Sequence, residues 1–166
     1  MIFHLIYGNI YIGTDFFREH LKMLGIRLVC VGNLKEKYLK DAAAEYMKRL
    51  TRFCDAEIIE TAESNPEKEK DAILKNLKGR VVALCVEGKQ QSSEKFSEFI
   101  EKTAQTDSKI TFVIGGSDGL AQDVKDRADV RLSFSEMTFP HQLMRIILLE
   151  QIYRAFTINN NIKYHK

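Results

Sequence analysis

Four short segments of the chain hold residues whose types and spacing suit chemistry. The clearest is a glycine-rich loop in which Gly115, Gly116 and Gly119 directly follow an apolar run. Glycines in such a place let the backbone turn sharply and approach a ligand closely. Their spacing matches neither G-x-G-x-x-G nor G-x-x-x-x-G-K-[ST], and no lysine follows to bind a phosphate. A tight turn between a strand and a helix is therefore an equally good interpretation.

The second and third segments surround the same region of the expected fold. Residues 135–140 are polar and end in Phe139-Pro140, just ahead of His141, while residues 87–89 form a short polar loop around Gly88. A bend at 135–140 that faces both glycine-bearing loops is expected to form a pocket of backbone donors and acceptors around a flat heterocycle. A plain connection between a strand and a helix is the alternative for 135–140.

The C-terminal segments carry side chains that suit RNA. The tail ends in Tyr164-His165-Lys166, and an aromatic residue beside basic ones is the composition that stacks a base and neutralises a phosphate. Tails of this kind are also commonly frayed. Arg145 and Arg154 are candidate contacts for phosphate or base. For each arginine a salt bridge is the favoured alternative, as with Glu150 four residues before Arg154.

These segments lie at the ends of an alternating series of strands and helices. Continuous apolar runs without in/out polarity indicate a parallel sheet with helices on both faces, an α/β fold. Ligands of such sheets bind beyond the carboxyl ends of the strands, where the loops described above are expected. The predicted strands are 26–31, 56–60, 81–86, 110–114 and 130–134, and the predicted helices are 34–50, 66–77, 92–106, 121–127 and 141–156.

Composition and charge exclude several classes of protein. A chain of 166 residues, 45% apolar and 29% charged, suits one globular domain and not a disordered or fibrous chain. The net charge of +2 excludes a protein that holds nucleic acid by bulk charge alone. The three cysteines Cys30, Cys54 and Cys85 show no C-x-x-C spacing, so we expect reduced thiols in a cytoplasmic protein and no metal site. No apolar run approaches the ~18 residues of a membrane span.

The first 22 residues differ from the rest of the chain. They hold five of the sixteen aromatic residues, carry no net charge and lack the basic start and cleavage site of a signal peptide. From Met23 the sequence reads as the start of an ordinary domain. We therefore expect 1–22 to be an N-terminal extension or a non-native leader, and 23–166 to be a single domain. An additional edge strand at residues 2–12 is the alternative.

The helix expected at 141–156 is apolar on all sides, because Ile146, Ile147, Leu148 and Leu149 follow one another. Such a helix is buried all round. In a small domain we expect a second copy of the chain to cover its remaining face, which predicts a homodimer.

Residues 23–166 resemble the RlmH (YbeA) family, bacterial methyltransferases of the ribosomal RNA large subunit in the SPOUT superfamily. The resemblance implies a parallel-sheet three-layer sandwich with a C-terminal trefoil knot. It also implies a homodimer that methylates N3 of a pseudouridine in the bridge stem-loop of 23S RNA, on the assembled 70S ribosome. The segments that carry it are IRLVCVGNLKEKY, ALCVEGK, FVIGGSDGL, LSFSEMTFPHQLMRIILLEQIYRAF and YHK.

The resemblance further implies S-adenosylmethionine as methyl donor, with no metal and no membrane. Carried over by position, the cofactor contacts fall on Leu84, Gly115, Gly116, Phe134, Ser135, Glu136, Met137, Thr138 and Phe139.

Four residues are candidates for the chemistry at the acceptor. Methyl transfer to N3 releases a proton, and histidine is the commonest general base. His165 ranks first, because a tail can reach a large substrate, and His141 second. Arg154 is a candidate to stabilise negative charge on the base, and Tyr164 to stack it.

Two alternative functions remain open at this point. One is a related knotted methyltransferase of transfer RNA, although such enzymes often carry an added RNA-binding domain for which no residues remain here. The other is a non-enzymatic α/β module that binds a nucleotide or RNA. Calorimetry with S-adenosylmethionine against ATP separates the second alternative from a methyltransferase.

Overall fold

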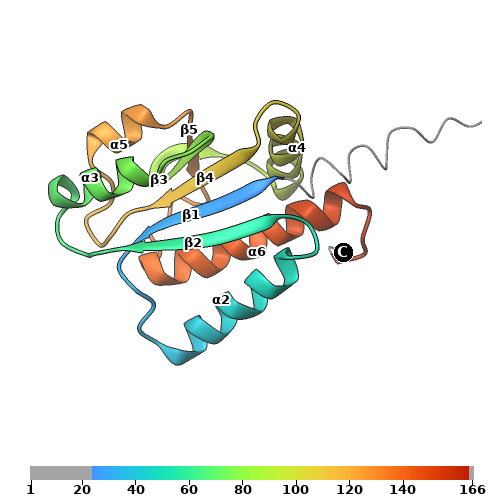
Figure 1. Ribbon diagram of the computed structural model, residues 1–166, viewed down its shortest axis with the longest axis horizontal. Coiled ribbons are helices and arrows are strands. Elements are labelled where there is room, and N and C mark those ends of the chain that lie inside the picture. Colours follow the sequence, from blue (N-terminus) through green and yellow to red (C-terminus); the bar gives the residue numbers. More distant parts are fainter. Residues whose placement is uncertain (1–23, 165–166) are drawn as a thin grey trace, which may run out of the picture.

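The computed structural model describes residues 24–164, in which strands and helices alternate (Figure 1). The predicted leader at 1–22 and the candidate base His165 lie outside the described residues. The elements in chain order are β1 (Gly25–Val31), α2 (Lys37–Leu50), β2 (Asp55–Thr61), α3 (Pro66–Asn76), β3 (Arg80–Gln90), α4 (Ser93–Ala104), β4 (Lys109–Ile114), α5 (Gln122–Arg127), β5 (Val130–Ser133) and α6 (His141–Asn159).

The five strands form one parallel sheet in the order β2-β1-β4-β3-β5. Every residue of the interior strand β1 is buried, as its continuous apolar run predicts. Helices α2, α4 and α6 pack on one face around the larger core cluster, and α3 and α5 cover the other face around Val29, Val31 and Val113. In Figure 1 α3 and α5 lie together on one side of the sheet, with α2 and α6 on the other. The predicted three-layer α/β sandwich is therefore confirmed, while the trefoil path of the chain stays a prediction.

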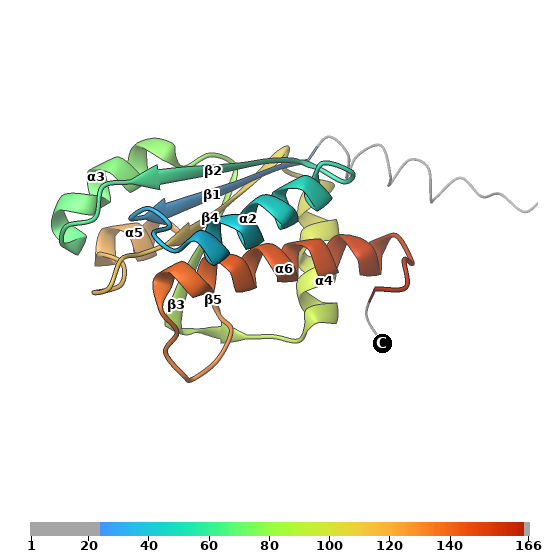
Figure 2. The ribbon, with the colours of Figure 1, turned by 90° about the horizontal axis from the view of Figure 1, so that it is seen from below.

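Helix α6 is covered mainly by its own protomer. It lies against the sheet, runs beside α2 and crosses α4 (Figure 2). Leu148, Leu149 and Ile152 are fully buried in this way. Neighbouring elements of the same protomer therefore cover most of this helix, and the expected cover of its remaining face by a second copy stays a prediction. Leu143 and Ile147 remain on its outer side, exposed and half-buried respectively.

Strand β3 extends further than the sequence predicts. The apolar run ends at Val86, but the strand continues to Gln90 and includes the polar residues expected to be a loop. Both Leu84 and Lys89 pair with Leu132 of β5, so the four residues between them leave the ladder as a bulge. Bulges redirect a strand, and this one carries residues 85–88 to the carboxyl edge of the sheet.

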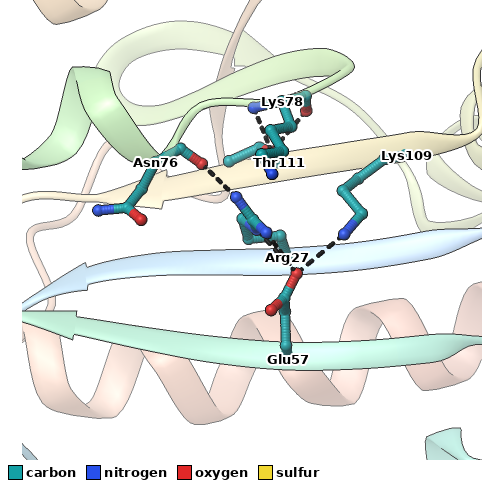
Figure 3. A network of polar contacts seen from close by, with 6 residues as sticks. All are labelled: Arg27, Glu57, Asn76, Lys78, Lys109 and Thr111. Carbon is teal, nitrogen blue, oxygen red and sulfur yellow. Dashed lines mark hydrogen bonds and ion pairs between the residues drawn. The ribbon is translucent and has the colours of Figure 1, made fainter.

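A polar network fixes the amino end of the sheet on the face of α3 (Figure 3). Arg27 is 8% exposed; its Nε donates to Glu57 Oε1 at 2.8 Å and its Nη1 to the Asn76 carbonyl at 2.8 Å. Lys109 Nζ donates to the same Glu57 oxygen at 2.9 Å. Hydrogen bonds from Lys109 and then Arg27 hold the pKa of Glu57 below its usual range. The network ties the C-terminal end of α3 to three strands.

The cysteines are free thiols, as the sequence predicts. Cys30 and Cys54 are buried, and burial raises the pKa of each thiol to about 12. Neither thiol is ionised at neutral pH, so both act as small apolar side chains in the core.

Candidate functional site

A pocket of about 770 Å³ opens at the carboxyl edge of the sheet, where the predicted loops meet. Its size lies within the usual range of small-molecule sites. One wall comes from the bulge of β3, a second from the glycine-rich loop after β4, and a third from the segment between β5 and α6. Figure 2 shows that last segment as an orange loop beside the far end of β3. The lining residues are 84–87, 114–120, Lys125, 132–135, 137–141 and Met144.

The glycine-rich wall is held by backbone bonding. The N–H of Gly119 donates to the Gly116 carbonyl at 3.1 Å, which closes a tight turn at the mouth of the pocket. The tight turn is therefore confirmed, and the same turn forms a wall of the pocket, while close approach to a ligand stays a prediction. An added Cβ at Gly116 would lie 3.1 Å from Val31 Cγ1 and 3.3 Å from Glu69 Oε1. A side chain there would press on the protein behind the wall.

The wall between β5 and α6 is shaped by two serine side chains. Ser133 Oγ donates to the Ser135 carbonyl at 2.9 Å, and Ser135 Oγ accepts from the N–H of Met137 at 2.9 Å. This local bonding turns the chain so that Met137, 72% exposed, lies at the rim. Val86, in the wall from the bulge of β3, is 52% exposed. Two exposed apolar side chains thus line the pocket, which suits a ligand with an apolar face.

Few groups in the pocket can exchange a proton near neutral pH. Cys85 lines it, but burial raises the pKa of its thiol, which disfavours the nucleophilic thiolate. Glu87 is paired with Lys125, and that hydrogen bond holds the pKa of the Glu87 carboxyl below its usual range. His141 is the one histidine that lines the pocket among residues 24–164. The arrangement therefore suits binding and positioning, with one candidate base, His141, in the lining.

Arg154 and Tyr164 lie at the other end of α6. Arg154 donates to Glu150 Oε1 through Nε at 3.0 Å and Nη2 at 2.7 Å, which confirms the salt-bridge alternative. Its guanidinium lies 5.2 Å from the centre of the Tyr164 ring. Tyr164 also meets Tyr153 edge-on, with ring centres 4.9 Å apart. Tyr164 is therefore packed against α6 and is not a frayed end.

The cluster around Tyr164 extends to α2. Tyr46 packs near Tyr153, and burial followed by hydrogen bonding to Tyr164 raises the pKa of Tyr46 to about 12. Arg49 lies over the rings of both Tyr46 and Tyr153. The thirteen residues from His141 to Arg154 correspond to about 20 Å along a helix. Within one protomer the structure therefore separates the pocket from the Arg154–Tyr164 cluster.

Residues 24–165 match the family described as "Predicted SPOUT methyltransferase". The chain belongs to the SPOUT methyltransferase family. A relative from Streptococcus sanguinis, named Ribosomal RNA large subunit methyltransferase H, is 53% identical over 157 residues, covering 85% of this chain and 99% of the relative. One from Clostridium perfringens, named Ribosomal RNA large subunit methyltransferase H 1, is 50% identical over 159 residues, covering 86% and 100%. These relatives confirm the resemblance to the RlmH family.

A solved structure shares the fold of this SPOUT family member. It is a probable methylase family protein from Haemophilus influenzae, with a TM-score of 0.53 and 16% identity. The match covers 88% of this chain and 71% of that one. At this identity the likeness supports the fold alone.

The structure brings most of the predicted cofactor residues of this SPOUT chain to one place. Glu136 is the exception, because it is exposed and lies outside the lining. Lys125 and Met144 are among the lining residues that the sequence did not predict. Helical spacing could have predicted Met144, since it lies three residues after His141 and so on the same face of the helix. The predicted residues that line the pocket are Leu84, Gly115, Gly116, Phe134, Ser135, Met137, Thr138, Phe139 and His141.

No group of three or more histidine, cysteine or acidic side chains within residues 24–164 is arranged to hold a metal ion. Over the same residues, no helix has the length and apolar character that crossing a membrane requires.

Proposed function

We propose that this protein transfers a methyl group from S-adenosylmethionine to N3 of a pseudouridine in the bridge stem-loop of 23S ribosomal RNA, on the assembled 70S ribosome. The observation that carries the proposal is the pocket, because it is built from the three loops at which the family resemblance places the cofactor. The relatives named for the ribosomal RNA large subunit support the substrate class. The cytoplasm, where ribosomes assemble, is the expected compartment.

The pocket fits this cofactor in size and chemistry. Its apolar residues Leu84, Phe134 and Phe139 suit a flat heterocycle, and backbone groups beside Gly115 and Ser135 suit its polar edge. When bound, the cofactor supplies an electrophilic methyl group on a sulfonium sulfur. The contribution of the chain is to hold the acceptor nitrogen in line with that group, about 3–3.5 Å away, which supplies much of the acceleration.

The candidates for the chemistry at N3 stand at two places, because the proton there needs an acceptor and the negative charge left on the base needs stabilisation. His141 lies at the pocket, whereas Arg154 and Tyr164 lie about 20 Å along α6. If both groups serve one reaction, the second group must come from another copy of the chain. We therefore propose a homodimer in which the outer side of α6, with Leu143 and Ile147, faces the partner.

Mass mapping of methylated nucleosides tests the substrate. Ribosomes from a strain without the gene are incubated with the protein and S-adenosylmethionine, and the position that gains 14 mass units is located. A new methyl group at N3 of a 23S pseudouridine is expected. Methylation of transfer RNA instead would support the related knotted enzyme, and binding of ATP in place of S-adenosylmethionine in calorimetry would support a nucleotide-binding module.

Mixing two inactive variants tests the two-copy site. A pocket variant, Phe139→Asp, and a tail variant, Arg154→Ala with Tyr164→Ala, are each expected to be inactive. If the pocket of one protomer works with the tail of the other, random re-pairing restores roughly a quarter of wild-type activity, because half of the dimers hold one intact site of two. If activity does not recover after the exchange of protomers has been verified, the two-copy site is contradicted. The proposal that the pocket binds the cofactor is not affected by that result.

A further inference from the structure

The Glu63 side chain lies outside the pocket and next to two of its walls. It belongs to the connection between β2 and α3, outside the pocket lining. Its Oε1 accepts a hydrogen bond from Ser117 Oγ at 3.3 Å and lies 3.9 Å from His141 Nε2. Ser117 comes from the glycine-rich loop and His141 is the first residue of α6, and both line the pocket. One carboxylate thus stands between two segments that are more than twenty residues apart in the chain.

The imidazole of His141 is incompletely bonded. Its Nε2 atom is buried and has no hydrogen-bond partner within the described part of the chain. An unpaired buried nitrogen is unfavourable, so the site favours any movement that provides a partner. His141 Nε2 lies 3.9 Å from Glu63 Oε1, which is at most about 1.2 Å longer than the usual hydrogen-bond distance of 2.7–3.2 Å. A small approach of the two side chains would therefore complete a hydrogen bond, strengthened by charge when the imidazole is protonated.

The backbone at Gly32 leaves the space for this approach. Gly32 has a φ of +76°, and an added Cβ there would lie 3.3 Å from Glu63 Oε2 and 3.6 Å from His141 Nε2. The other charged group near the carboxylate is Lys35, whose Nζ lies 4.0 Å from Oε2. The Lys35 side chain is 70% exposed, so water screens its attraction more than that of His141, whose side chain is 17% exposed.

We propose that Glu63 is a positioning residue, whose carboxylate ties Ser117 to His141 behind the pocket and so sets the spacing of the two walls that receive the cofactor. The proposal rests on the proposed function, because the cofactor is S-adenosylmethionine there. Glu63 acts through its two partners: the bond to Ser117 is present in the structure, and the bond from His141 forms when the pocket is filled.

Calorimetry with S-adenosylmethionine on the full chain tests this role. Glu63→Gln keeps the size of the side chain and an oxygen for Ser117, but loses the charge that attracts His141. We expect the affinity for S-adenosylmethionine to fall about tenfold, the lower end of what a charged hydrogen bond contributes. Glu63→Asp, which retains the charge, recovers part of the affinity. The matched control is Glu98→Gln, which removes an exposed carboxylate paired with Lys102 on α4 and leaves the affinity unchanged.

Nitrogen NMR of the histidine rings provides a second measurement that does not depend on activity. The signals of His141 are assigned by their loss in His141→Gln. In the wild type with S-adenosylmethionine, we expect the Nε2 signal of His141 to be that of a protonated, hydrogen-bonded nitrogen. In Glu63→Gln we expect this signal to be lost. Unchanged affinity and an unchanged spectrum in Glu63→Gln would overturn the role of Glu63 while cofactor binding by the wild type stands. Absence of binding by the wild type would overturn the proposed function itself, and the role of Glu63 with it.

Discussion

Replacing Arg145 with methionine tests how the start of α6 is held against the sheet. The Arg145 side chain is fully buried; its Nη1 donates to Glu60 Oε1 and its Nη2 to the Gly32 carbonyl at 2.9 Å. Glu60 Oε1 also accepts from the N–H of Leu34 at 3.2 Å. One guanidinium thus joins α6 to the ends of β1 and β2 and to the chain that leads into α2, directly behind the pocket.

The magnitude follows from these contacts. Hydrogen bonds to a charged group contribute about 1.5–3 kcal/mol each, and methionine removes two of them. Relief from burying the guanidinium offsets part of the loss. The Glu60 side chain is 36% exposed, so water partly replaces the lost partner. We expect Arg145→Met to lower the free energy of unfolding by about 2–4 kcal/mol.

Urea unfolding followed by circular dichroism provides the measurement. The control is Arg131→Met, whose pair with Asp126 is largely exposed and should contribute less than about 1 kcal/mol. Adding Glu60→Gln to Arg145→Met should recover part of the loss, because the unpaired carboxylate is then absent. A loss below about 1 kcal/mol for Arg145→Met, or a double variant whose losses simply add, would refute this account.

Three further predictions concern other parts of the molecule. Leu149→Asp should prevent stable folding, because Leu149 is buried within the protomer, whereas Ile147→Asp should leave the fold intact and shift light scattering from dimer to monomer; a monomeric wild type would contradict the proposed dimer. The pKa of Glu57 is depressed in the folded protein, so its ion pairs stabilise the fold above the usual pKa of a glutamate, about 4, and this contribution disappears as the pH falls through the lower folded value. The stability difference between wild type and Glu57→Gln should therefore shrink on acidification, and a constant difference in urea titrations from pH 7 to pH 3 would be inconsistent with it. Tyr164→Ala should cost about 1 kcal/mol of stability through its lost ring contacts and reduce methyl transfer strongly, while Tyr164→Phe should be mild in both measurements; equal effects of the two variants would argue against stacking.

Local patterns in the sequence predicted the elements of the fold closely. The apolar run at 26–31 became β1, and proline at the first position of α3 fitted the helix start, where Asn65 also caps the N–H of Lys68. These signals are local, because strand burial and helix capping depend on residues a few positions apart.

Features that depend on distant segments could not be predicted in the same way. The extension of β3 through Lys89 requires β5 as a partner, and nothing in the polar sequence at 87–90 indicates it. The packing of α2 and α4 against α6 could not be predicted without knowing the order of the helices on the sheet. The packing of Tyr164 depends on Tyr153 and on Tyr46 of α2, which come together only in the fold.

The length of α6 decides how the candidate residues can share the work. A helix is rigid over this distance, so a residue at its first position and one thirteen positions later cannot meet in one protomer. Among the candidates within residues 24–164, His141 is then the one that a single copy offers to its own pocket, held by the segment that Arg145 fixes to the sheet. Arg154 and Tyr164, already bonded to Glu150 and to each other, form a preorganised surface with no cavity of its own within the described residues. A surface of this kind can complete a pocket that another copy supplies. In the proposed homodimer the two groups of candidates are therefore complementary parts of one site and not competing positions for it.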